Sequence, residues 1–150
     1  MIFSLQLLLG AEPLRPDPLI GSWEGVWNLP RGMSEEEGHF RLRVWQGRKG
    51  LKGSMLETAF VEVEIVLNDQ DEPSRRTTHH LTNRKVPLRA IKTFPASPSR
   101  YRFEADGTCW NATLTQDRLE GMWNGGPCTV MGVGIGARLI SFTATRTAGR

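Results

Sequence analysis

The clearest pattern in the chain is an alternation of side chains between Leu19 and Leu29. Read with a period of two, this stretch places Trp23 and Trp27 on one face and Glu24 and Asn28 on the other. A period of two is that of a β-strand with one buried face, whereas a helix repeats every 3.6 residues. The stretch therefore predicts a strand that contributes two tryptophans to a core.

Similar alternation returns about every ten residues along the chain, and no convincing helix follows residue 18. The next strand is predicted at 40–45, and a turn at Gly47–Gly50 leads from it into another strand. Further strands are predicted at 61–67, 79–85, 86–94, 101–105, 108–115, 118–123 and 138–146. Segment 29–38 is predicted to be a turn followed by a charged surface loop or a single helical turn, and segment 68–78 is predicted to be an exposed loop. A bulge is expected between Met55 and Val61, and the glycine-rich segment 125–136 is expected to be a long loop.

Two tight turns predict the pairing of the aromatic strands. Asp106-Gly107 is a strong signal for a two-residue hairpin turn, and it sets Phe103 opposite Trp110. A second reversal at 116–117 sets Trp110 opposite Trp123. Both turns place their aromatic residues on the same apolar face, so we expect these strands to share one core.

Eight to ten short strands joined by hairpins predict an all-β protein, a single up-and-down antiparallel β-barrel, lipocalin-like in outline. A chain of 150 residues is one domain by size. We expect the barrel to span 19–147, preceded by segment 1–18 and followed by a short tail at 148–150.

The apolar start of the chain, 1–11, resembles a short secretory signal, and the alternative is a helix that caps the domain. The first reading predicts a secreted or periplasmic protein and the second is compatible with the cytoplasm. Eleven residues are too few to span a bilayer. Cys109 and Cys128 fit either compartment, as a disulfide after export or as two buried thiols.

The net charge of +3 is mild, and the basic residues are spread along the chain with only Arg48-Lys49 and Arg75-Arg76 as doublets. Binding to nucleic acid needs clustered cations, so no nucleic-acid partner is expected. The pattern gives no oligomeric state.

The last strand carries an argument for closure of the barrel. By parity Arg146 points inward with Phe142 and Ala144, and antiparallel pairing of the last strand with the first brings Arg146 close to Trp23. An arginine stacked on an indole would close that end of the barrel.

Gly21-Ser22-Trp23 on the first strand, together with the late inward Arg146, resembles the calycin pattern of lipocalins and of bacterial lipocalin-like or avidin-like barrels. In those families the tryptophan of Gly-X-Trp packs under a late arginine at the closed end. The resemblance implies a barrel that holds a small hydrophobic molecule. The polar residues with which avidin holds biotin have no match here, so biotin is not implied.

Residues of the inward face are candidates for the wall of such a cavity, and glycines at 25, 53 and 121 would leave room beside them. The predicted ligand-binding residues are Trp27, Leu42, Val44, Met55, Val63, Tyr101, Phe103, Trp110 and Trp123. The competing interpretation is that these aromatic residues simply fill a core.

Three functions fit this pattern: a binding module for a small hydrophobic molecule, a cyclase or isomerase acting on an apolar substrate inside the barrel, and a structural or interaction module with a filled core. An enzyme would use Glu57 or Tyr101 for proton transfer, since these are the candidates placed inside by parity. His79 and His80 point to opposite faces of a strand, so no metal site is predicted. No motif indicates a cofactor.

Overall fold

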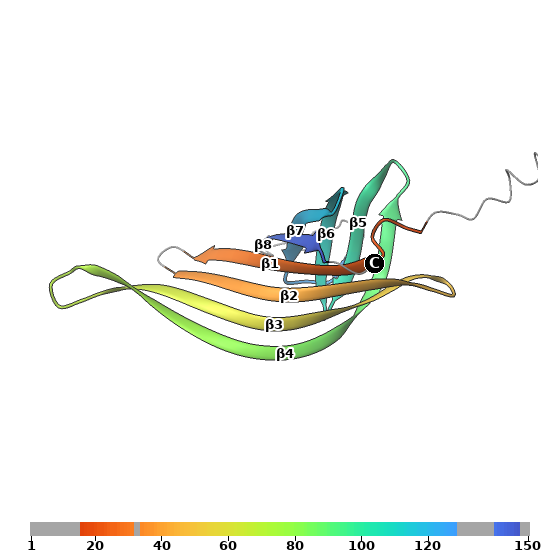
Figure 1. Ribbon diagram of the computed structural model, residues 1–150. Coiled ribbons are helices and arrows are strands. Elements are labelled where there is room, and N and C mark those ends of the chain that lie inside the picture. Colours follow the sequence, from red (N-terminus) through yellow and green to blue (C-terminus); the bar gives the residue numbers. More distant parts are fainter. Residues whose placement is uncertain (1–15, 32–33, 129–139, 148–150) are drawn as a thin grey trace, which may run out of the picture.

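The computed structural model describes residues 16–31, 34–128 and 140–147 of the chain. Eight antiparallel strands form a closed barrel in chain order, with the last strand paired to the first (Figure 1). The predicted fold class, an all-β up-and-down antiparallel barrel, is confirmed. Residues 1–15, most of the predicted loop at 125–136, and the tail lie outside the described residues.

The strands differ greatly in length. They are β1 (Gly21–Arg31), β2 (Ser34–Gly47), β3 (Gly50–Leu67), β4 (Pro73–Phe94), β5 (Ser97–Ala105), β6 (Thr108–Thr115), β7 (Arg118–Asn124) and β8 (Ile140–Arg146). The predictions split β3 into two strands and β4 into two, and they made 34–38 a loop. Segment 34–38 is a strand although its polar side chains predicted a loop, because it lies between β1 and β3 and its backbone pairs with both.

Every cross-strand pair predicted from a tight turn is observed. Phe103 lies opposite Trp110, and Trp110 lies opposite Trp123. Asp106 and Gly107 have φ of 50° and 76°, as a two-residue turn with two left-handed positions requires. Short turns therefore determine the register of this half of the barrel.

The expected bulge lies at Thr58, between Glu57 and Ala59 of β3. One extra residue reverses which side chains face inward. Phe60 therefore shares the face of Trp27, since both residues lie opposite Gly38. Val63 lies on the other face, so its predicted place in the cavity wall is wrong.

The hairpin formed by β3 and β4 projects well beyond the rest of the barrel (Figure 1). All residues from 67 to 85 are exposed. Leu81 is 87% exposed, the largest value among the exposed large hydrophobic side chains of the described chain. This arm has no core beneath it.

The core fills the barrel between the two ends. It consists of aliphatic and aromatic side chains from all eight strands, among them Trp23, Phe40, Leu42, Val44, Met55, Leu88, Tyr101, Phe103, Trp110, Leu119 and Phe142. The inward glycines leave no free room, because large side chains pack on them: a Cβ at Gly25 would lie 2.4 Å from the Phe40 ring, and one at Gly53 would lie 2.7 Å from Leu88. The glycines serve close packing.

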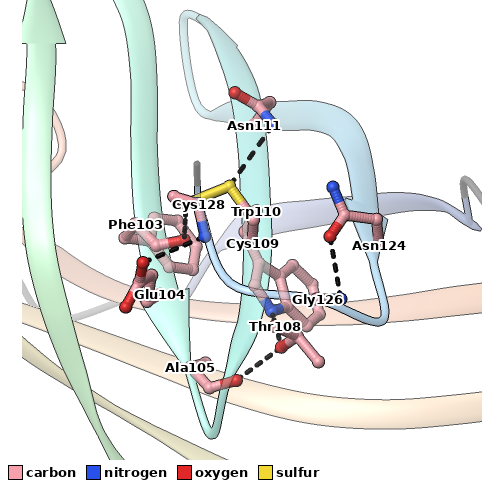
Figure 2. The surroundings of a disulfide bond; sticks show 10 residues. All are labelled: Phe103, Glu104, Ala105, Thr108, Cys109, Trp110, Asn111, Asn124, Gly126 and Cys128. Carbon is pink, nitrogen blue, oxygen red and sulfur yellow. Dashed lines mark hydrogen bonds between the residues drawn. A yellow bond between two sulfur atoms is a disulfide. The ribbon is translucent and has the colours of Figure 1, made fainter. Parts of the chain in front are cut away.

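A disulfide joins Cys109 of β6 to Cys128, which follows β7, across a sequence separation of 19 (Figure 2). The backbone amide of Cys128 also donates to Glu104 Oε1 at 2.9 Å. Closing a loop of this length stabilises the fold by about 3 kcal/mol in the chain-entropy account. The bond attaches the segment after β7 to the outside of the barrel.

Candidate functional site

One end of the barrel is closed by the contact between β1 and the end of β8. Arg146 Cζ lies 4.2 Å from the centroid of the Trp23 ring, and the two residues are direct partners in the sheet. The guanidinium also donates to Asp117 Oδ1 at 2.8 Å and to the Ile20 carbonyl at 2.7 Å. The Trp23 indole donates to the carbonyl of Leu19 at 3.0 Å. Trp23 is fully buried and the Arg146 side chain is only 9% exposed, so these two side chains close this end of the barrel.

Tyr101, a predicted ligand-binding and catalytic candidate, belongs to this closed end. Its hydroxyl donates to Asp17 Oδ1 at 2.8 Å, and the residue is 1% exposed. Burial, and then the hydrogen bond to the Asp17 carboxylate, raise the pKa of the Tyr101 phenol well above its usual range. A phenol held this way is a poor proton donor.

Other predicted cavity-wall residues lie in the packed middle of the barrel. Leu42, Val44, Met55 and Phe103 are each at most 2% exposed. Trp110 is 4% exposed and contacts the rings of Phe40, Phe103, Trp123 and Phe142. In this part of the barrel the aromatic residues fill a core.

The opposite end of the barrel is different, because four rings gather there without being fully buried. We call Trp27, Phe60, His80 and Trp123 the aromatic site. The centroid of the Trp27 ring lies 5.4 Å from that of Trp123, with the two ring planes nearly perpendicular, and 5.9 Å from that of Phe60. The centroids of Phe60 and His80 lie 5.7 Å apart. These edge-to-face and tilted arrangements are typical of attractive ring pairs.

The local backbone explains how these rings are positioned. Trp27 lies directly on Gly38, where a Cβ would come within 2.0 Å of the indole. Phe60 reaches the same face through the bulge at Thr58, and His80 is its cross-strand partner on β4. A glycine and a bulge thus bring β1, β3 and β4 together at this end.

The indole N–H of Trp123 is buried and donates to no acceptor among the residues that the structure describes. Buried donors in proteins are nearly always paired, and leaving one unpaired costs about 1–3 kcal/mol. Asn124 Nδ2, on the outer side of β7, is also buried and unpaired, while its Oδ1 accepts from the Gly126 amide at 3.0 Å (Figure 2). Of the two donors, that of Trp123 belongs to the aromatic site.

The two predicted catalytic candidates are not brought together. Glu57 lies opposite Phe40 in the sheet, but its side chain is 42% exposed, and its Oε2 atom lies 3.7 Å from Arg84 Nε. Tyr101 is bound to Asp17 at the closed end. Among the described residues, no three His, Cys, Asp or Glu side chains are grouped so as to hold a metal ion.

Phe60 and His80 were not predicted for the site. His80 pairs with Glu62 at 3.7 Å between nitrogen and oxygen, and it lies on the opposite face of β4 from His79. Between Met55 and Val61, apolar and polar residues do not alternate in a way that would locate the bulge. Counting alternate residues from Met55 and counting them back from Val61 therefore place Phe60 on opposite faces of the strand.

Comparison with models of protein families and with curated proteins gives no match for this chain. The eight-stranded closed barrel is compatible with a calycin-like fold. The described part of the chain also contains no helix with the length and apolar character needed to cross a bilayer.

Proposed function

We propose that the protein binds a small, flat, hydrophobic molecule at the aromatic site, as a lipocalin-like module. The observation that carries the proposal is the unpaired indole N–H of Trp123 among the half-buried rings of Trp27 and Phe60. A molecule with an aromatic body would contact these rings, and an acceptor on it would satisfy the N–H.

The proposal moves the binding region from the middle of the barrel to its aromatic end. The packed residues Leu42, Val44, Met55 and Phe103, each at most 2% exposed, then belong to the core of the barrel and make no contact with the ligand. Trp23 and Arg146 hold the other end closed. A site built on a closed sheet of this kind is largely preformed, which limits the entropy lost when a ligand binds.

We also propose that the protein works outside the reducing cytoplasm, in the periplasm or secreted. The disulfide between Cys109 and Cys128 supports this, because such bonds persist in oxidising compartments. An exported barrel would meet its hydrophobic ligand free in solution or at a membrane surface.

The test compares fluorene with 9-fluorenone, two planar molecules that differ by one carbonyl acceptor. Each is titrated against the protein and followed by quenching of tryptophan fluorescence. We expect both to bind, with fluorenone about tenfold tighter because its carbonyl accepts from Trp123, a difference equivalent to about 1.4 kcal/mol.

Trp123→Phe keeps a ring at the same place but has no N–H. It should abolish the preference for fluorenone while fluorene still binds. Trp45→Phe, on the outer surface, is the matched control and should retain the preference. Failure of both molecules to bind would overturn the proposed function, and equal binding by the wild type would overturn the role of the N–H.

A further inference from the structure

The β2–β3 hairpin carries a strongly one-sided charge. From residue 41 to residue 55 the sequence contains five cations and no Asp or Glu, although acidic residues are frequent on both sides of it. The cations are Arg41, Arg43, Arg48, Lys49 and Lys52. The hairpin is thus a basic segment within a chain whose net charge is only +3.

The basic residues surround a turn that projects from the barrel. Arg48 and Lys49 form the tip between Gly47 and Gly50 and are exposed, and in Figure 1 this turn extends beyond the start of β1. A side chain at Gly50 would meet nothing within 4 Å. The tip is therefore accessible to a large, flat partner.

Most of these cations form no ion pair with a carboxylate of the described residues. Arg41 pairs with Glu24 at 3.2 Å. Among the described residues, Arg43, Arg48, Lys49 and Lys52 form no ion pair. Their charge is available to an external anion.

An exposed tryptophan lies within this basic segment. Trp45 is 40% exposed on the outer face of β2, directly opposite Lys52. A cavity of about 600 Å³ lies beside it, lined by Trp45, Lys52, Gly53, Ser54, Lys85, Pro87 and Leu88. The ammonium groups of Lys52 and Lys85 can contact a phosphate headgroup, and the apolar side chains beside them can contact the start of an acyl chain.

We propose that the β2–β3 tip docks on an anionic phospholipid surface. Lys49 and Lys52 contact headgroup phosphates, and Trp45 inserts its indole at the interface, where tryptophan is favoured. The cations surround a convex turn with a single exposed indole, whereas single-stranded nucleic acid is held in a groove by several stacked rings. The export proposed above from the disulfide is compatible with such a surface, because an exported protein meets the outer side of a membrane.

The experiment measures co-sedimentation of the full chain with vesicles at low salt. Vesicles of phosphatidylcholine alone are compared with vesicles containing roughly one-third phosphatidylglycerol. We expect at least about tenfold stronger binding to the anionic vesicles, weakened by added salt because surface charges are screened. Trp45 should shift its emission to the blue on binding, seen as the difference between the wild type and Trp45→Phe.

The double variant Lys49→Glu with Lys52→Glu should lose binding to the anionic vesicles. Arg75→Glu with Arg76→Glu makes the same change of net charge on the projecting arm and should retain it. Both pairs are exposed, so circular dichroism should show both variants folded. Equal loss in the two variants would overturn the proposal in favour of net charge alone. Tighter binding to an oligothymidine than to the vesicles, or no preference for anionic vesicles, would also overturn it.

Discussion

At the scale of single residues, Arg146 is the side chain on which the closed end of the barrel depends. Only 9% of its side chain is exposed, and it combines a stacking contact with Trp23, an ion pair with Asp117 and a hydrogen bond to the Ile20 carbonyl. A planar guanidinium makes these contacts together, and an ammonium group has neither the flat face nor the fork of donors.

We therefore expect Arg146→Lys to lower the free energy of unfolding by about 1–3 kcal/mol, although the charge is kept. Urea unfolding followed by tryptophan fluorescence measures the change. Arg118→Lys is the matched control, because Arg118 is 59% exposed and its pair with Glu120 lies on the surface. It should leave stability within about 0.5 kcal/mol of the wild type. Equal effects of both variants would show that the closed end does not depend on the guanidinium.

Tyr101 gives the chain a pH dependence that can be read directly, because it is the only tyrosine in the sequence. Burial and the bond to Asp17 raise the pKa of its phenol in the folded chain above the ordinary value of 10.0. The folded state holds this proton more tightly than the unfolded state does. Its contribution to stability is therefore complete below about pH 10 and is lost progressively as the pH rises above that value.

Titration of tyrosinate absorbance should accordingly show no ionisation near pH 10 in the folded protein, followed by ionisation together with unfolding at higher pH. In urea the same absorbance should titrate near about pH 10. Tyr101→Phe should remove the part of the alkaline loss of stability that this phenol causes. A folded-state titration near the ordinary pKa would show that the hydroxyl is accessible to water.

At the scale of strands, a cross-strand pair could be predicted from the sequence where a short turn sets the register between the two strands. The pairings of Phe103, Trp110 and Trp123 follow from two short turns, and the meeting of Trp23 with Arg146 follows from parity once the barrel closes. Local turn chemistry specifies such pairings, so the sequence reveals them.

The aromatic site depends on features that the pattern does not locate. Thr58 is the extra residue that turns Phe60 inward and Val63 outward, and a bulge of this kind can be placed only when the neighbouring strands are in position. Glycine at 25 marks close approach, but only the structure shows that the Phe40 ring takes the space predicted for a ligand. The cavity was therefore expected in the filled middle, and His80 was not expected beside Phe60.

At the scale of the whole molecule, the chain divides into a packed barrel and a bare arm. Residues of β6 such as Trp110 and Ala112 are 4% exposed and lie within the core. In the arm, every residue from 67 to 85 is exposed, and β4 is paired only with β3 there. A two-stranded ribbon without a core is marginally stable by itself.

Local stability should therefore differ between the barrel and the arm. In native-state hydrogen exchange, we expect backbone amides hydrogen-bonded in β6 and in the core part of β2 to be protected close to the global free energy of unfolding. Amides of the arm between Glu64 and Arg76 should exchange about a hundredfold faster or more, because local opening there breaks no core contacts. Equal protection in both regions would show that another surface covers the arm in solution.

Added apolar ligand should slow exchange around Trp27 and Phe60 and leave the tip of the arm unchanged, since only the aromatic site gains contacts.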